Sequence, residues 1–218
     1  MAGMRDSRQQ PPGLGSTIRQ NLDVPLVLTG RVSDIRVGGP GGQLAAIGGK
    51  RAVLLIDLDQ PRRTVLSLKF PSAWDKVELA WNYSQAHSSV LASSNNRDAL
   101  VWDVAAEQST ATVAEANRQP ITCLAWAPFF PHLLATCSAD STVNLFDVRT
   151  LAPPPSRGLS SGQGAPQRPS LSLTSPGLPG ASVLAWNRTN GNVLATAHSN
   201  QLWLWDIRGG SSAQQRPP

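Results

Sequence analysis

The sequence predicts an all-β chain made of about four similar units, each a four-stranded antiparallel sheet. Three observations predict it: four segments align with one another, equivalent positions recur at a spacing near 45 residues, and apolar residues alternate with polar ones inside each segment. Gly and Pro, with 18 residues each in a chain of 218, supply frequent turns and argue against long helices. A hydrophobic content of 40% is enough to bury a core.

The repeat is the strongest of these signals. The segments run over residues 32–58, 77–104, 121–148 and 181–207, and each ends in an apolar run closed by Asp. The closing residues, which are separated by 46, 44 and 59 positions, are Asp57, Asp103, Asp147 and Asp206. Subtracting an insertion of about fifteen residues from the last interval restores a period near forty-five, which is the range of a four-stranded propeller blade.

Each strand of the unit has its own justification. The first strand is predicted by period-two alternation, as in Thr122–Trp126 and Leu184–Trp186. The second carries Leu-Ala-Ser or Leu-Ala-Thr, whose large and small residues alternate as crowded inner strands require. The third ends at the closing Asp, as in Leu100–Val104. A fourth, outer strand is predicted for the first three units only, at Thr64–Phe70, Thr110–Ala114 and Ser170–Thr174.

Aromatic residues mark fixed positions of the unit. Trp102-Asp103, Phe146-Asp147 and Trp205-Asp206 close three repeats, and this dipeptide is typical of WD repeats. Asp140 stands in the turn between the second and third strands, where such a residue ties the turn to its blade. We expect the first-strand tryptophans Trp81, Trp126 and Trp186 to be buried. The predicted fold class is therefore all-β: an incomplete WD-repeat β-propeller whose last blade lacks its outer strand.

The domain organisation follows from the same alignment. A partial propeller is expected over 26–208, with blades at about 31–70, 76–115, 120–175 and 181–208. Composition rich in Pro, Gly, Ser and Gln predicts disordered tails at 1–25 and 209–218 and a disordered insertion at 151–169. Complete propellers carry four to eight blades and WD propellers generally seven, so the chain is interpreted as a fragment or a truncated isoform.

An open propeller has exposed ends. The strand Gln201–Ile207 should present an unpaired outer edge, which is a site for pairing with another chain. The face of the first blade around Ile47, Val53 and Leu55 should also lack a neighbour. Both ends are therefore expected to expose apolar surface.

Charge and hydropathy exclude several classes of function. The net charge is +5, but residues 31–149 and 181–207 hold 12 basic and 12 acidic residues, so the excess lies in the tails and the insertion. A nucleic-acid binder concentrates Lys and Arg on one folded face, so direct nucleic-acid binding is not expected. No apolar run reaches the roughly 18 residues of a membrane-spanning helix, and no secretory signal opens the sequence. The chain is predicted to be intracellular, with only indirect membrane association.

No set of residues predicts catalysis, a cofactor or a metal. Cys123 and Cys137 fall on the first and second strands of one blade and are expected to pack as small buried thiols. His87 and His132 are expected in turns, isolated from each other, and His198 on a propeller face. Nothing activates a nucleophile, so an enzyme acting on a small molecule is not predicted.

Candidate partner-binding residues are few. Arg149 and Arg208 each follow a closing Asp by two positions, and with His198 they are the candidates for contact with another protein. The competing interpretation is that each Arg pairs locally with its own repeat, since most surface ion pairs signify little.

A more specific resemblance is carried by Gly48-Gly49-Lys50-Arg51, Ile56-Asp57-Leu58-Asp59-Gln60-Pro61 and Trp74-Asp75-Lys76-Val77. Together with Ala92-Ser93-Ser94-Asn95 and Asp147-Val148-Arg149, these stretches resemble the amino-terminal propeller of the WD-repeat, RWD-containing subunits of the GATOR-type (SEA) complex. The similarity covers about residues 44–208, apart from the insertion.

The resemblance implies a non-enzymatic scaffold that contacts other protein subunits. Its complex relays amino-acid availability to the target-of-rapamycin kinase complex and lies at the lysosomal or vacuolar membrane, so a cytoplasmic, peripheral location is implied. The alternative is a substrate receptor of a cullin-type ubiquitin ligase, in which Arg149 and Arg208 dock the adaptor.

Overall fold

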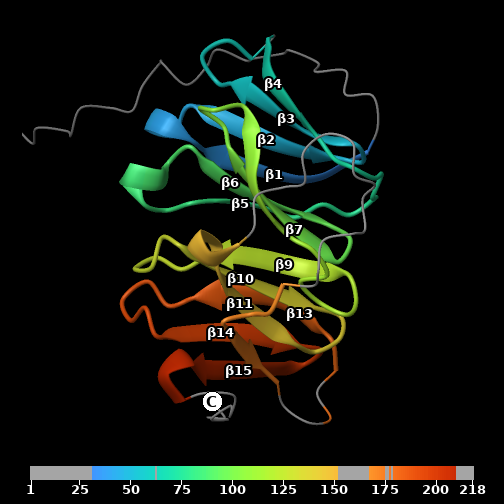
Figure 1. The fold of residues 1–218 in the computed structure, drawn as a ribbon, viewed down its shortest axis with the longest axis vertical. Coiled ribbons are helices and arrows are strands. Elements are labelled where there is room, and N and C mark those ends of the chain that lie inside the picture. Colours follow the sequence, from blue (N-terminus) through green and yellow to red (C-terminus); the bar gives the residue numbers. More distant parts are fainter. Residues whose placement is uncertain (1–30, 62, 152–166, 175–176, 178, 210–218) are drawn as a thin grey trace, which may run out of the picture.

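Four antiparallel sheets succeed one another along the longest axis of the molecule, with the first and the fourth at opposite ends (Figure 1). The computed structural model describes residues 31–61, 63–151, 167–174, 177 and 179–209. The predicted tail 1–25, residues 210–218 of the predicted tail 209–218 and most of the predicted insertion lie outside these residues. The sheets are called blades one to four in chain order.

The strands have the following bounds. Blade one contains β1 (Val32–Gly38), β2 (Leu44–Gly49), β3 (Ala52–Asp57) and β4 (Thr64–Lys69). Blade two contains β5 (Leu79–Trp81), β6 (Val90–Asn95), β7 (Asp98–Asp103) and β8 (Gln108–Val113). Blade three contains β9 (Ile121–Trp126), β10 (Leu133–Ser138), β11 (Val143–Asp147) and β12 (Leu171–Leu173). Blade four contains β13 (Ala181–Trp186), β14 (Val193–His198) and β15 (Gln201–Asp206).

Short 3-10 turns occupy some of the connections. They are η1 (Pro40–Gly42), η2 (Gln85–His87), η3 (Val148–Thr150) and η4 (Ile207–Gly209). In every blade the strand order in space is the order in the chain, and the first strands of successive blades lie next to one another. The predicted fold class is confirmed: the described chain is an all-β, incomplete propeller whose fourth sheet has three strands.

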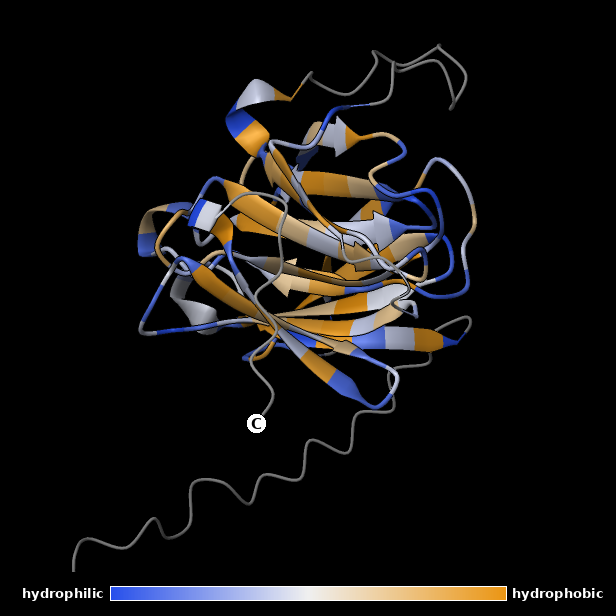
Figure 2. Cartoon of the chain, turned by 90° about the horizontal axis from the view of Figure 1, so that it is seen from below, coloured by the Kyte–Doolittle hydropathy of each residue, from blue (hydrophilic) through white to orange (hydrophobic). Residues whose placement is uncertain are grey.

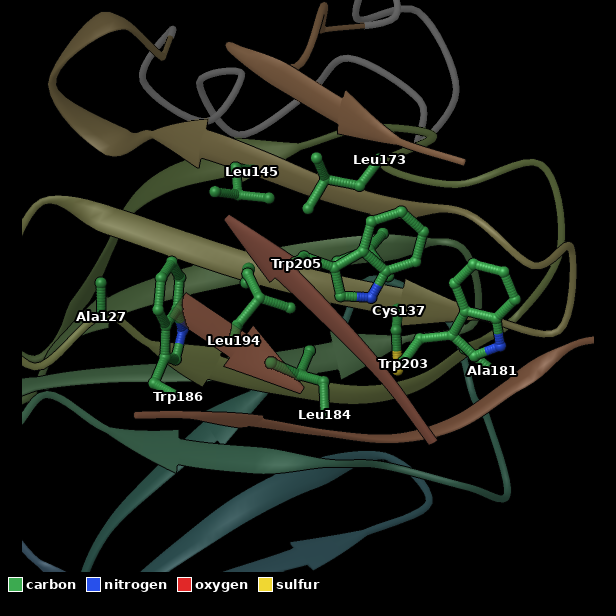
Figure 3. Packing of buried hydrophobic residues seen from close by; sticks show 12 residues of the cluster. Ala127, Cys137, Leu145, Leu173, Ala181, Leu184, Trp186, Leu194, Trp203 and Trp205 are labelled. Atoms are coloured by element: carbon green, nitrogen blue, oxygen red, sulfur yellow. The ribbon is translucent and has the colours of Figure 1, made fainter. Parts of the chain in front are cut away.

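The core lies between the blades. Three clusters of buried apolar side chains fill the spaces between successive sheets, one at each interface. Figure 3 shows the cluster between blades three and four, where Leu145 and Leu173 of one sheet face Leu184, Leu194 and Trp205 of the other. Figure 2, which looks onto the blade-four end, shows apolar residues along the strands and hydrophilic residues gathered in the turns.

The first-strand tryptophans also link the blades through hydrogen bonds. Trp81 donates its indole N–H to the carbonyl of Arg36, and Trp126 donates to that of Ala80, each at 3.1 Å. Trp186 donates in the same way to Ala125 at 3.3 Å. All three are buried, as expected from the sequence. We call this series the indole ladder.

One expectation for the open end of blade one is wrong. Val53 and Leu55 are fully buried, because their side chains point toward blade two, and Ile47 is only 8% exposed. Among the apolar side chains that blade one exposes, Val65 of the outer strand is 50% exposed, and Ile35 and Val37 of the innermost strand are 53% and 61% exposed. Ile35 and Val37 stand at the positions that Leu79 and Trp81 occupy in blade two. In blades two to four the side chains at these positions pack against the preceding sheet, and on β1 they are exposed.

Aspartates tie the outer turns to the blades. In blade three, Asp140 accepts hydrogen bonds from the backbone of Thr142 at 2.9 Å and of Arg118 at 2.7 Å. In blade two, Asp98 accepts from the backbone N–H of Glu115 at 2.8 Å. Both carboxylates therefore bond the segment between β8 and β9, Asp98 from the blade that this segment leaves and Asp140 from the blade that it enters.

Candidate protein-interaction surface

Arg149 and Arg208 form the same pair with the aspartate that closes their own repeat. Each guanidinium contacts both oxygens of Asp147 or Asp206, with its Nε 2.9 Å from Oδ1. Asp147 is the N-cap of the turn η3 and also accepts the backbone N–H of Arg149 at 3.0 Å. The arginine side chains nevertheless remain about two-thirds exposed, at 65% and 66%. Each Arg therefore pairs with the aspartate of its own repeat, and the rest of its guanidinium remains exposed to solvent.

The arginines stabilise the charged form of these carboxylates. The side-chain hydrogen bonds from Arg149 lower the pKa of Asp147, and those from Arg208 lower the pKa of Asp206 to about 2. A group with a lowered pKa binds protons more weakly in the folded chain than in the unfolded chain. The contribution of Asp206 to folding is therefore fully present above its ordinary pKa of 3.8 and is lost as the pH falls through about 2.

This pair can be tested by titration. We expect the carboxyl carbon of Asp206, followed by NMR, to titrate with a midpoint near 2 in the native chain. Replacing Arg208→Gln removes the charged donor, so the midpoint should rise toward the ordinary value for Asp. Arg188→Gln, in a different turn, is the control. An unchanged midpoint in Arg208→Gln would show that the pair does not form in solution.

The prediction for His198 is wrong. Its side chain is fully buried, with Nε2 2.8 Å from the hydroxyl of Thr196 and Nδ1 2.8 Å from the carbonyl of Pro179. Thr196 in turn accepts the indole N–H of Trp205 at 2.7 Å. His198 therefore belongs to a buried hydrogen-bond network inside blade four and presents nothing to a partner.

The same network occurs in part in the other blades. In blade two, Trp102 donates to the hydroxyl of Ser93 at 2.8 Å. Phe146 stands at the equivalent place in blade three and has no N–H, so Thr136 donates instead to Asn117 at 2.7 Å. The hydroxyl of the Leu-Ala-Ser/Thr run is thus bonded inside the blade, to the third-strand tryptophan in blades two and four and to Asn117 in blade three.

An exposed aromatic surface, which the sequence analysis missed, lies across three blades. It consists of Tyr83, Phe129, Phe130 and Arg188 in the turns between the first and second strands of blades two, three and four. The aromatic residues are 54%, 54% and 44% exposed. We call this set the aromatic surface.

Contacts between blades hold the aromatic surface together. The Arg188 guanidinium carbon lies 5.0 Å from the centre of the Tyr83 ring, a cation–π distance. Phe129 lies so close to Gly191 that an added Cβ there would be 2.7 Å from the ring. Asn82 donates to the carbonyl of Pro131 at 2.7 Å. Aromatic residues and Arg are enriched at protein interfaces, which makes this surface the best-formed candidate for binding a partner.

His87 and His132 also meet beside these turns, although the sequence placed them apart. Their rings are 4.8 Å apart between centres and perpendicular to each other. Among the described residues, no group of three or more His, Cys, Asp or Glu side chains is placed to hold a metal ion. Nor does the described part of the chain contain a helix long and apolar enough to cross a membrane.

The two cysteines are directly opposite each other on β9 and β10. Cys137 is buried and Cys123 is partly exposed, on the side of blade three that packs against blade four. The thiol of Cys137 donates a hydrogen bond to Cys123, which lowers the pKa of Cys123 to about 7. The same hydrogen bond, together with burial, raises the pKa of Cys137. Cys123 is therefore the thiol that deprotonates first.

The two thiols should differ in reactivity. We expect iodoacetamide to modify Cys123 in the folded chain, with a rate that rises through pH 7 because the thiolate is the nucleophile. Cys137 should react only after unfolding. Replacing Cys137→Ala removes the donor and should shift the rate profile of Cys123 toward higher pH. Peptide mass spectrometry distinguishes the sites, and equal modification of both thiols in the folded chain would contradict the assignment.

Comparison with known proteins agrees with this architecture. The family model described as "WD domain, G-beta repeat" matches residues 108–147, which run from β8 to the closing Asp of blade three. The sheets are WD-repeat blades.

Curated relatives extend the similarity over most of the chain. It is 30% identical over 175 residues to "Maintenance of telomere capping protein 5" of Saccharomyces cerevisiae, and 28% identical over 174 residues to "GATOR2 complex protein WDR59" of Homo sapiens. It is 35% identical over 171 residues to a WD repeat-containing protein of Dictyostelium discoideum. These matches cover 78–79% of this chain but only 14%, 16% and 8% of the respective relatives.

Proposed function

We propose that the chain is a non-enzymatic scaffold subunit of a GATOR-type complex and that the aromatic surface binds another protein subunit. The similarity to a GATOR2 complex protein supports the assignment to such a complex. The observation that carries the binding role is the exposure of Tyr83, Phe129 and Phe130 on two turns, beside Arg188 on a third. An interaction surface built this way needs no cofactor, small-molecule substrate or nucleic acid.

The wider role follows from the resemblance. The complex would relay amino-acid availability to the target-of-rapamycin kinase complex, and the chain would be held at the lysosomal or vacuolar membrane through the other subunits. RWD-type and zinc-binding functions are not part of the proposal, because the resemblance is restricted to the propeller.

Affinity purification of the tagged chain from cells tests the proposal. GATOR2-type subunits should be recovered, and Tyr83→Ala/Phe129→Ala should reduce their recovery about tenfold, as expected when interface anchors are truncated. Val65→Ala, which shortens an apolar side chain 50% exposed on β4, is the control. Equal recovery with the double variant would overturn the role of the aromatic surface. Absence of these subunits from every eluate would overturn the assignment to the complex.

A cullin-type ubiquitin ligase receptor is the second candidate, favoured by the two exposed guanidinium groups after Asp147 and Asp206. Recovery of a cullin adaptor, lost in Arg149→Ala/Arg208→Ala, would support it over the scaffold assignment. Adaptor recovery that survives this double variant would exclude docking through these arginines.

A further inference from the structure

The two cysteines of the chain lie side by side on neighbouring strands of blade three. Cys123 of β9 is directly opposite Cys137 of β10, so both side chains leave the sheet on the same face, toward blade four. Directly opposite residues of an antiparallel pair have Cα atoms about 4.5–5.5 Å apart, and disulfides form when this distance is about 4.4–6.8 Å. The backbone therefore holds the two cysteines where a disulfide can join them.

The surroundings of the two thiols differ. Cys137 is fully buried, and Figure 3 shows it inside the apolar cluster between blades three and four. Cys123 is partly exposed, and its S–H donates to the carbonyl of Leu184 in blade four at 3.7 Å. Because its pKa is about 7, roughly half of Cys123 is thiolate near neutral pH. Cys123 is therefore the nucleophile that solvent can reach, and Cys137 is a shielded thiol beside it.

We propose that these two residues form a reversible redox site, in which Cys123 reacts with hydrogen peroxide and Cys137 then joins it in a disulfide. In the first step the Cys123 thiolate attacks one oxygen of the peroxide, the O–O bond breaks, and Cys123 sulfenic acid and hydroxide form. In the second step the Cys137 sulfur attacks the Cys123 sulfur, the S–O bond breaks, and the thiol proton leaves with the hydroxyl group as water. The two thiols give two electrons to the peroxide, and a dithiol reductant restores them by exchange.

The state of Cys137 fits this order of events. While Cys123 is a thiolate, the hydrogen bond to Cys123, burial and the charge of Cys123 raise the pKa of Cys137, so Cys137 stays protonated. Oxidation of Cys123 removes the hydrogen bond to the thiolate and its charge. The hydroxyl of Thr122, 3.4 Å from the Cys137 sulfur, is then the polar group beside the attacking atom. Cys137 is therefore expected to react only after Cys123 has been oxidised.

The disulfide would change the contact between two blades. It joins β9 to β10 within blade three, and it removes the S–H that Cys123 donates to Leu184 of blade four. Thr122, the neighbour of Cys123, keeps its own bond to blade four, which is a donation to the carbonyl of Ala181 at 2.6 Å. Oxidation therefore acts on the interface between blades three and four, away from the turns that form the aromatic surface.

Treatment of the full 218-residue chain with hydrogen peroxide near pH 7 is the first test. We expect the intact mass to fall by two hydrogen atoms and dithiothreitol to restore it. Chymotrypsin cuts after Trp126 and Phe129, between the two cysteines, so non-reducing mass spectrometry should find the two fragments joined. An unreactive chain, a chain that gains oxygen without forming the disulfide, a disulfide between two copies, or a disulfide that forms only in urea would each overturn the proposal.

Single substitutions test the separate roles of the two thiols. In Cys137→Ala, Cys123 should stop at the sulfenic acid, which dimedone captures. In Cys123→Ala, the remaining thiol of Cys137 should react with hydrogen peroxide about tenfold more slowly, because it is buried and protonated. Circular dichroism checks that both variants are folded. Equal rates in the two folded variants, or no dimedone adduct in Cys137→Ala, would contradict the assignment of Cys123 as the thiol that meets the peroxide.

Discussion

Replacing Trp126→Ala is expected to lower the free energy of unfolding by about 3–5 kcal/mol, the range for deleting a large aromatic side chain from a core. Trp126 is fully buried between blades two and three, and its indole N–H bonds to Ala80. The change removes both the packing and one step of the indole ladder. Because small domains have about 5–15 kcal/mol of stability, a substantial part of the margin is lost.

Urea denaturation followed by circular dichroism measures this change. Tyr83→Ala serves as the control, since Tyr83 is 54% exposed and its truncation should cost within about 1 kcal/mol. A loss for Trp126→Ala no larger than that for Tyr83→Ala would contradict the burial of Trp126 between the blades.

Thr196→Val is expected to have the second largest effect. The substitution keeps the shape of the side chain but leaves the indole N–H of Trp205 and the Nε2 of His198 without their partner. Each buried polar group left unpaired costs about 1–3 kcal/mol. The midpoint of urea unfolding should therefore fall clearly.

Thr196→Ser is the matched variant, because it retains the hydroxyl and loses only a methyl group. It should recover most of the stability that Thr196→Val loses. If both substitutions destabilise the chain equally, the methyl packing and not the hydrogen-bond network stabilises blade four.

The repeat could be predicted because it depends on patterns among residues that are close in sequence. The Leu-Ala-Thr runs, the aromatic–Asp closures and the spacing of Trp81, Trp126 and Trp186 each follow from strand geometry, and they predicted the all-β blades. The direction in which a blade face points was harder to predict. Val53 and Leu55 were placed on an open face because alternation says which residues share a side, but not which neighbour covers that side.

The candidate site was harder to predict from the sequence. His198 is polar and near a strand end, so the sequence predicted it on a surface. In the structure it is buried and hydrogen-bonded to Thr196 and to Pro179, which lies 19 residues earlier. The aromatic surface joins turns of three blades and therefore has no local pattern. One signal was available: Phe129-Phe130 between two prolines is an apolar pair in a turn, where polar residues are usual.

The indole ladder has a consequence for how the chain opens. Every rung joins a blade only to its predecessor, so stability is passed between nearest neighbours, as in a one-dimensional array. Within the described residues, the ladder holds blades two and three from both sides and blades one and four from one side each. Thermal fluctuations should therefore fray the array from its ends, with amide hydrogens of β9 exchanging long after those of β15.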